Sequence, residues 1–288
     1  MNNTTTAATR LEKLSKGETV FLTILNSIGC VYGTTANVLV IFVIWNVQPL
    51  RTNRNFLLAC LSSSDFLSCV VWQPILLDGI LNGIRLDLQV QSFCAFFVAL
   101  ASLNHLVSLT AERYVAVHYP FRYIEKLTTR LVVVVCLVSY GLALALTTLV
   151  TTNIMTVKVV YYYIVFVALA ILIIYVKIYI TARKKARSIV VFKVDSTGSR
   201  VLKMFPQKGE KTTFTVGIVV GLLLLSWLPY VLIPFVPKDE LLYAFPWINT
   251  CAVLQSNINP FIYFWRFEKF RNGLIRLKQQ YSVRVGIL

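Results

Sequence analysis

The chain has 288 residues, of which 57% are hydrophobic and only 14% are charged, and its mean hydropathy is +0.70. Soluble domains contain about 45–50% apolar and about 25% charged residues, so these values exclude an ordinary soluble domain, and they exclude a disordered chain as well. The 28 lysines and arginines exceed the 12 acidic residues by 16, which fits either a nucleic-acid-binding surface or basic loops on one side of a membrane.

Seven apolar runs are long enough to cross a bilayer, whose ~30 Å core requires about 20 residues of helix. They occupy residues 20–45, 56–80, 92–117, 131–152, 159–181, 212–236 and 241–264. The connections between them are short. The sequence therefore predicts an all-α membrane protein, with a seven-transmembrane helix bundle over 20–264 and no soluble domain.

The segments outside the runs indicate an orientation. Residues 1–19 contain two overlapping N-glycosylation motifs that begin at Asn2 and Asn3. The basic loops and the basic tail all lie on the opposite face, at 46–54, 118–130, 183–211 and after 265. Because cytoplasmic loops are enriched in lysine and arginine, we expect an extracellular N-terminus, a cytoplasmic C-terminus and a multi-pass location in the plasma membrane.

Residues 265–288 form a short tail that begins with an amphipathic helix. Phe267, Phe270, Leu274 and Leu277 recur at helical spacing among lysines and arginines, a pattern typical of a helix on a membrane surface. Counted together with Glu112 and Arg113, the expected cytoplasmic segments hold 21 lysines and arginines against five acidic residues, and this difference equals the whole excess of positive charge. The excess therefore indicates contact with anionic lipid and a signalling partner, not with nucleic acid.

Motifs at defined depths carry a family resemblance. They are Asn37 in the first run, Asp65 in the second, Glu112-Arg113-Tyr114 at the end of the third, Trp227-Leu228-Pro229 in the sixth and Asn259-Pro260-Phe261-Ile262-Tyr263 in the seventh. In this order, they make the chain resemble a rhodopsin-like (class A) G-protein-coupled receptor over nearly its whole length. The resemblance implies a cell-surface receptor that couples an extracellular ligand to a heterotrimeric G protein through outward movement of the sixth helix.

The resemblance also implies an activation switch, made of Glu112, Arg113, Tyr114, Tyr175, Trp227, Pro229, Asn259, Pro260 and Tyr263. Glu112 can hold Arg113 by a charge-assisted hydrogen bond, and release of this bond would free the guanidinium for the G protein, Tyr175 or Tyr263. The alternative is an arginine that snorkels at a helix end. Pro229 and Pro260 remove backbone donors, so each should kink its helix. Trp227 is expected under the ligand, although it would fill the core equally well.

Asp65 is the only acidic residue near the middle of any run. An unpaired carboxylate at this depth should either become protonated or capture a cation. By resemblance, Ser102 and Asn259 join Asp65 around an allosteric sodium ion. The alternative is a protonated Asp65 that is hydrogen-bonded to Asn37 and Asn259.

The outer cavity implied by the resemblance is lined by Trp72, Gln91, Phe96, Tyr163, Trp227, Tyr230, Phe245 and Asn249. Its wall is aromatic and largely uncharged, with Asp78 and Asp87 at the rim, so a lipid-like or neutral small molecule is favoured over a basic peptide. Core packing alone also explains many of these aromatic residues. Ala95 replaces the aspartate of amine receptors, and Val253 replaces the lysine to which opsins attach retinal. Neither an amine salt bridge nor a covalently bound cofactor is therefore expected.

The expected cytoplasmic face presents a G-protein contact. Phe121, in the loop after Arg113, matches the apolar knob that receptors of this family insert into the G protein. Arg113 itself is the second contact residue. The basic loop 183–211 would form the rim of this surface.

The six cysteines (30, 60, 69, 94, 136 and 251) all lie within the runs. We expect reduced, apolar residues, with neither a disulfide nor a metal site. The usual outer cysteine of the family is replaced by Leu88, and Ser139 stands where a tryptophan is usual. With a fifth run that lacks its usual proline, these departures favour the melanocortin, cannabinoid and lysophospholipid branch.

The main alternative is a multi-pass transporter that uses Asp65 as an ion-coupling site. Transporters normally carry broken helices in symmetry-related positions and several intramembrane charges. Here the charges away from the ends of the runs are few: Asp65 lies near the middle of the second run, and Lys177 lies near one end of the fifth. An intramembrane enzyme is not indicated, because neither His105 nor His118 lies in a catalytic motif.

Overall fold

The computed structural model describes residues 14–83, 87–188, 191–194, 200–203, 221–222 and 225–284. The helices are α2 (Lys16–Asn46), α3 (Asn53–Leu67), α4 (Gln73–Asn82), α5 (Leu88–His118), α6 (Pro120–Lys126), α7 (Thr129–Thr151), α8 (Lys158–Ser188), α10 (Lys238–Arg266) and α11 (Glu268–Arg284). Residues 225–232 form a further helix, called here the 225–232 helix, which ends in a 3-10 turn at Ile233–Phe235. Another 3-10 turn lies at Gln48–Leu50.

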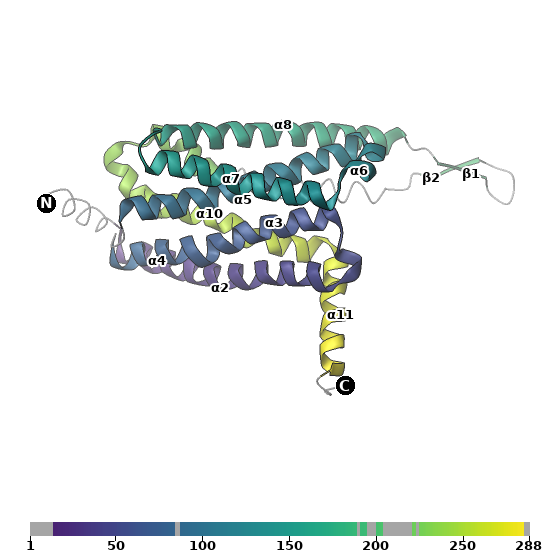
Figure 1. Ribbon diagram of the computed structural model, residues 1–288, viewed down its shortest axis with the longest axis horizontal. Helices are drawn as coiled ribbons and strands as arrows, with labels where there is room; N and C mark the ends of the chain where they lie inside the picture. The colour runs from purple at the N-terminus through teal and green to yellow at the C-terminus, as the bar shows by residue number, and fades with distance from the viewer. Residues whose placement is uncertain are drawn as a thin grey trace.

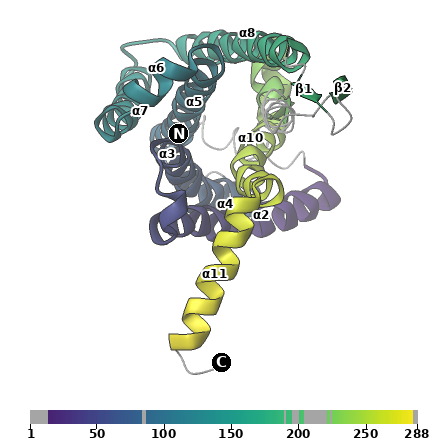
Figure 2. The same ribbon diagram turned by 90° about the vertical axis from the view of Figure 1, so that its right-hand side faces the viewer.

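The long helices run side by side and form one bundle (Figure 1). In the view along the bundle, they surround a common interior, and α7 lies at its rim (Figure 2). Helix α5 packs against α3, α7 and α8, while α2 packs against α3, α4 and α10. We call the two ends of this bundle the Ser15 end, where α2 begins, and the α11 end.

Five of the described helical spans are long and apolar enough to cross a membrane. They are α2, the continuous span from α3 to α4, α5, α7 and the part of α8 up to Thr181. Helices α3 and α4 are joined by a π-helical turn at Ser68–Trp72, which keeps the second span in one piece. Of the predicted sixth span at 212–236, only 221–222 and 225–236 are described.

Helix α10 corresponds to the seventh predicted span but is more polar than the others. Its polar residues include Asn249, Gln255, Ser256 and Asn259, each at most 4% exposed. They face the bundle interior, where neighbouring helices supply their hydrogen-bond partners. The polar side of α10 is therefore directed into the protein rather than toward lipid, which is the usual direction for polar residues within a membrane.

The outer surface of the bundle has the opposite character. Val31, Leu137 and Phe166 are among many large apolar side chains left exposed, at 70%, 67% and 70% respectively. A water-soluble monomer rarely exposes so continuous an apolar surface. An apolar outer surface around an interior that holds the polar residues is the arrangement of a helix bundle in lipid.

The first helix begins earlier than the apolar run because its N-terminus is capped. Ser15 Oγ accepts a hydrogen bond from the Glu18 backbone N–H, and the Glu18 side chain accepts one from the Ser15 N–H. This capping box satisfies two backbone donors and starts α2 at Lys16, four residues before the predicted span.

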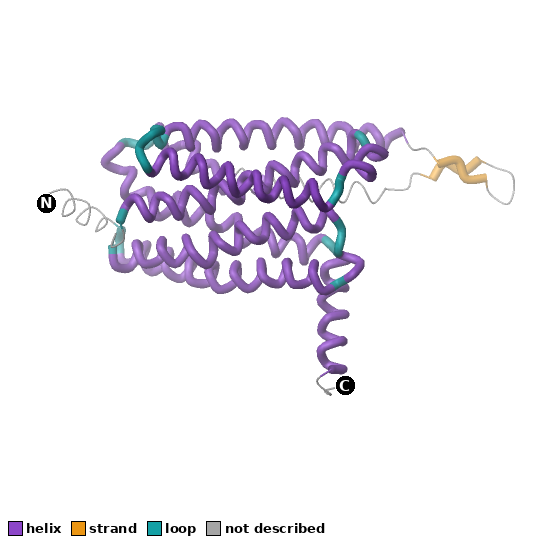
Figure 3. Tube along the Cα trace, in the orientation of Figure 1, coloured by secondary structure: helices purple, strands orange, loops and turns teal. Residues whose placement is uncertain are grey.

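The predicted basic loop at 183–211 is partly structured. Helix α8 continues to Ser188, because the alanine, lysine and arginine residues after 181 favour helix. Strands β1 (Val191–Val194) and β2 (Arg200–Lys203) then pair antiparallel, with Val191 opposite Lys203 and Val194 opposite Arg200. This hairpin, coloured orange in Figure 3, projects from the α11 end. The hairpin adds two short strands in this loop to a fold that is otherwise helical, as predicted.

Helix α11 turns away from the bundle axis where α10 ends (Figure 1). Phe270 is buried in a cluster with Val43, Val47 and Leu50 at the end of α2. Phe267, Leu274 and Leu277 pack against the same cluster, whereas Lys269, Arg271, Arg276 and Lys278 are exposed. The segment is thus an amphipathic surface helix, as its spacing predicts.

Candidate functional site

Asp65 lies at the meeting point of three helices. Its Oδ1 accepts hydrogen bonds from Ser102 Oγ of α5, at 2.7 Å, and from Ser256 Oγ of α10, at 2.9 Å. Its Oδ2 accepts one from Asn259 Nδ2, at 2.8 Å. Asp65 is fully buried, and none of the described lysines and arginines forms an ion pair with it. Three donors match the acceptor-only chemistry of an ionised carboxylate.

The structure brings together all three residues predicted for the Asp65 site and adds Ser256. Asn37, which the alternative interpretation paired with Asp65, instead donates from Nδ2 to the carbonyl oxygens of Gly33 and Ser256. It therefore holds the α10 backbone beside the carboxylate. Ser256 could have been suspected because it lies three residues before Asn259, on the same helix face.

Glu112 and Arg113 form an ion pair at the α11 end of α5. Arg113 Nε lies 3.0 Å from Glu112 Oε2, and the Glu112 side chain is only 2% exposed. The other oxygen, Oε1, accepts a hydrogen bond of 2.6 Å from the Tyr123 hydroxyl. Burial and the bond to Glu112 raise the pKa of the Tyr123 phenol, so it stays protonated and donates at neutral pH.

Tyr123 is a site residue that was not predicted to belong to the switch. It lies on α6, the short helix after α5, and reaches back eleven residues to Glu112. The carboxylate is thus held from two sides, by Arg113 and by Tyr123. Arg54, at the start of α3, adds an electrostatic attraction to Glu112.

The other predicted switch residues at the α11 end are dispersed. Tyr114 stacks on His118 with the ring centroids 4.0 Å apart, and His118 Nε2 lies 2.9 Å from Thr181 Oγ1, which links α5 to α8. Tyr263 is buried, and its hydroxyl has no hydrogen-bond partner within the described part of the chain. Tyr175 packs against the core between α5 and α8. None of the contacts recorded for the described residues joins Arg113 to either tyrosine.

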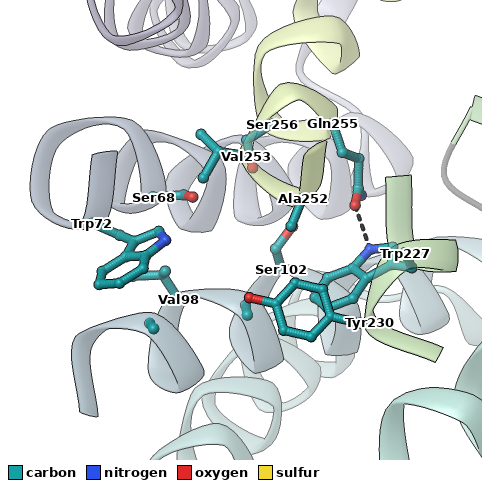
Figure 4. A pocket seen from close by; sticks show the side chains of 12 residues that line it. Ser68, Trp72, Val98, Ser102, Trp227, Tyr230, Ala252, Val253, Gln255 and Ser256 are labelled. Carbon is teal, nitrogen blue, oxygen red and sulfur yellow. Dashed lines mark hydrogen bonds between the residues drawn. The ribbon is translucent and has the colours of Figure 1, made fainter. Parts of the chain in front are cut away.

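Trp227 and Tyr230 link the 225–232 helix to α10. Trp227 Nε1 donates a hydrogen bond of 2.5 Å to Gln255 Oε1, and the Tyr230 hydroxyl donates one of 2.6 Å to Asn249 Oδ1. Figure 4 shows the bond from Trp227 to Gln255, with the Tyr230 ring beside the indole. Pro229 lies between these two aromatic residues, and Pro260 lies inside α10.

A small cavity of about 20 Å³ separates Trp227 from the Asp65 site. It is lined by Trp227 and Tyr230 and by Ser102 and Ser256, both of which donate hydrogen bonds to Asp65 (Figure 4). Trp72 also lines it. This volume accommodates about one water molecule. The tryptophan and the carboxylate site are therefore neighbours across a single small space.

A larger cavity of about 160 Å³ opens toward the Ser15 end, between α5, α8, the 225–232 helix and α10. Of the eight residues predicted for the ligand site, it is lined by Gln91, Phe96, Tyr230, Phe245 and Asn249. Trp72 and Trp227 line the smaller cavity instead. Among the described residues, the wall of the larger cavity contains no acidic side chain.

Tyr163 is not among the residues that line the larger cavity. Its hydroxyl donates a hydrogen bond of 2.6 Å to Asn104 Oδ1, so the side chain points between α8 and α5 rather than into the larger cavity. Tyr161, two residues earlier, lines the cavity. On a helix, two residues correspond to a rotation of about 200°, which explains why one tyrosine faces the cavity and the other does not.

The remaining predicted residues have the following positions. Phe121, on α6, is 83% exposed at the α11 end, near the Glu112–Arg113 pair. Asp87 caps α5 at the Ser15 end, where its side chain accepts from the Gln89 N–H. Asn2 and Asn3 lie outside the described residues. All six cysteines are free thiols.

Comparison with known proteins adds independent information. The family described as 7 transmembrane receptor (rhodopsin family) matches residues 36–159. Trace amine-associated receptor 4 of Mus musculus is 26% identical over 283 residues, covering 83% of this chain and 79% of the relative. Trace amine-associated receptor 6 of Homo sapiens is 26% identical over 310 residues, covering 90% and 86%. By their names, neither belongs to the melanocortin, cannabinoid or lysophospholipid branch that the sequence favoured.

The family match covers the end of the first predicted membrane helix and the whole of the second, third and fourth, and the relatives extend the similarity over most of the chain. The bundle, the Glu112–Arg113 pair and the three-helix contacts of Asp65 agree with it. The chain is accordingly a multi-pass membrane receptor and not an enzyme, and a transporter is not favoured. Over most of its length, it is similar to members of the rhodopsin-like family of seven-transmembrane, G-protein-coupled receptors.

Proposed function

We propose that the receptor binds a neutral or lipid-like small molecule in the larger cavity, with the Ser15 end extracellular. The observation that carries the proposal is the composition of the cavity wall. Phe96, Tyr161, Tyr230 and Phe245 give it an aromatic surface, and Gln91 and Asn249 supply uncharged polar groups. Apolar walls with a few convergent polar groups are typical of small-molecule sites.

An amine is the second candidate, because the relatives are named trace amine-associated receptors. An ammonium group would meet only aromatic faces and amides in this cavity, since Ala95 lines the wall where amine receptors have an aspartate. Aromatic faces attract cations more weakly than a carboxylate does. The neutral ligand is therefore favoured over the amine.

The signal would pass from the cavity to the α11 end through Trp227. A ligand beside Tyr230 touches a residue that also lines the small cavity next to Ser102 and Ser256. A shift of the indole would disturb its bond to Gln255 and let the 225–232 helix turn about Pro229. Outward movement of the sixth helix at the α11 end would then release Arg113 from Glu112.

The α11 end is proposed as the cytoplasmic, G-protein-binding face. It carries Arg113, the exposed Phe121 and the basic residues of the hairpin and α11. The exposed cations of α11 lie opposite its buried apolar side, an arrangement that suits anionic lipid headgroups. In this orientation, the positive excess is cytoplasmic, as is usual for membrane proteins.

The Asp65 site is proposed to hold a sodium ion. Asp65, Ser102 and Ser256 offer hard oxygen ligands, and Asn259 would present its amide oxygen after a rotation of the side chain. A buried ionised carboxylate without a cationic side chain beside it calls for a compensating cation. These residues belong to α3, α5 and α10, so an ion there would tie the three helices together.

A nucleotide-exchange assay tests the receptor proposal. Membranes containing the chain would be screened with neutral lipids, uncharged small aromatics and amines, with the wild type and Phe245→Ala compared. A neutral compound should stimulate exchange, and Phe245→Ala should weaken its potency about tenfold or more, because an aromatic contact of the wall is lost. Leu169→Ala, on the exposed side of α8, is the matched control. Stimulation by amines alone would favour the second candidate.

A further inference from the structure

Three potential metal ligands meet between α3, α5 and α7, away from the receptor site. The Sγ atoms of Cys60 and Cys136 and a ring nitrogen of His105 all lie within 4.8 Å of one another. The three helices pack against one another, which holds the group in place. Cysteine thiolates and histidine are the ligands that Zn²⁺ and other soft transition metals prefer.

His105 is oriented as a metal ligand. Its Nδ1 lies 2.7 Å from the Ala101 carbonyl oxygen, so Nδ1 carries the proton and Nε2 presents a lone pair. The side chain is 1% exposed, and Nε2 has no hydrogen-bond partner among the described residues. At metal centres, a ligating histidine usually donates from one ring nitrogen to a backbone carbonyl or carboxylate and binds the metal through the other.

Tyr140 fixes the ring of His105 from a second side. The two rings meet edge to face with the centroids 4.7 Å apart, and the Tyr140 hydroxyl is hydrogen-bonded to Ser63 Oγ at 2.7 Å. Ser63 in turn donates to the Cys60 carbonyl oxygen. The shell around the three ligands is therefore ordered, and it connects the histidine to the helix that carries Cys60.

We propose that Cys60, His105 and Cys136 form a binding site for one Zn²⁺ ion, with a fourth position open to water. In a tetrahedral zinc site the ligand atoms lie about 3.5–3.8 Å apart, so rotations of the cysteine side chains would bring the three into place. The total charge of the site would be zero, because two thiolates balance the Zn²⁺ ion and the imidazole is neutral. Neutrality keeps the cost of burying the site in an apolar bundle low.

The site would act as a cross-link near the α11 end of the bundle. Cys60 and Cys136 each lie seven residues after the start of their helices, about 10 Å along the axis. An ion there would join α3 and α7 through α5, the helix that carries Arg113. Metal occupancy would therefore restrain the helix on which the Glu112–Arg113 pair lies. The site does not depend on the ligand or coupling proposed above.

The test is metal analysis of the purified full-length chain, kept reduced in lipid nanodiscs. After equilibration with buffered Zn²⁺ and removal of free metal, the wild type should retain about one zinc ion per chain. Cys60→Ser, Cys136→Ser and His105→Asn should each reduce retention to about a tenth or less. Cys251→Ser, which removes a thiol from α10, is the matched control and should retain the ion.

A spectroscopic measurement on the wild type makes the test independent of variant folding. Co²⁺ bound to Cys60 and Cys136 should give the near-ultraviolet charge-transfer bands of cobalt thiolates and visible bands of tetrahedral cobalt, and added Zn²⁺ should abolish both. The proposal is overturned if these bands are absent. Equal zinc retention by the wild type and a Cys60→Ser/Cys136→Ser double variant would overturn it too.

Discussion

Trp227 Nε1 and Gln255 Oε1 are joined by a buried hydrogen bond of 2.5 Å, which couples the 225–232 helix directly to α10. Both residues are at most 4% exposed. Both residues line the small cavity next to Ser102 and Ser256, and Trp227 contacts Tyr230, which lines both cavities.

The first prediction concerns this bond. Gln255→Leu should destabilise the receptor by about 1–3 kcal/mol, because it leaves the buried indole N–H without an acceptor. Trp227→Phe removes the donor and keeps most of the apolar volume. Thermal unfolding of both single variants and the double variant would measure the coupling, which should make the double variant less destabilised than the sum of the singles. If the destabilisation of the double variant equals the sum of the two single variants, the bond contributes nothing to stability.

The second prediction concerns Asp65. Asp65→Asn keeps the shape of the side chain but removes the charge that would hold sodium. The wild type should melt at a higher temperature in Na⁺ than in equimolar N-methylglucamine, and the variant should lose this difference. Asp78→Asn, an acid at the Ser15 end that is hydrogen-bonded to Asn82, should keep it. The same Na⁺ dependence in Asp65→Asn would contradict the sodium site.

The third prediction concerns the ion pair at the α11 end. Glu112→Gln weakens the contact with Arg113 by removing the charge, so basal nucleotide exchange should rise several-fold. Tyr123→Phe removes the hydrogen bond from Tyr123 to Glu112 but leaves the ion pair with Arg113, so it should raise basal exchange less than Glu112→Gln does. Arg113→Ala, with normal surface expression, should abolish coupling. Exchange that persists in this variant would rule out the role of Arg113.

The fourth prediction concerns the close approach of α2 and α10. A Cβ added at Gly33 would clash with Asn257 Oδ1 and would lie 2.5 Å from Cys69 Sγ. Gly33→Ala should therefore destabilise the bundle by about 1–3 kcal/mol through overpacking. Gly79→Ala is the matched control, since nothing lies within 4 Å of its added Cβ. A Gly33→Ala receptor as thermostable as the control would contradict the packing of these helices.

The fifth prediction concerns the attachment of α11. Phe270→Ala removes the side chain that buries α11 against the end of α2 and should cost about 3–5 kcal/mol. Ile275→Ala, on the 55% exposed side of the same helix, should have little effect. Surface expression and thermal unfolding would both distinguish the two. Equal behaviour of both variants would mean that α11 is not anchored by Phe270.

Much of this architecture follows from the linear pattern of residues. The length of each apolar run determines which segments can cross a membrane, because backbone polar groups in lipid must be satisfied within a helix. The same reasoning marks Asp65 as exceptional, since a charge at that depth is costly wherever the neighbouring helices lie. The pairing of Glu112 with Arg113 is likewise local, because the two residues are adjacent in the chain.

Contacts between helices depend on rotations and close approaches that no single segment specifies. Ser256 was not predicted at Asp65, and Tyr163 was expected in a cavity that Tyr161 lines, because a helix can present either residue until its neighbours determine its rotation. Cys60, His105 and Cys136 are far apart in sequence, and only the packing of α3, α5 and α7 brings their ligand atoms together. The sequence by itself determined which segments enter the membrane and which polar residues are costly there, whereas the tertiary structure decided which of those residues meet.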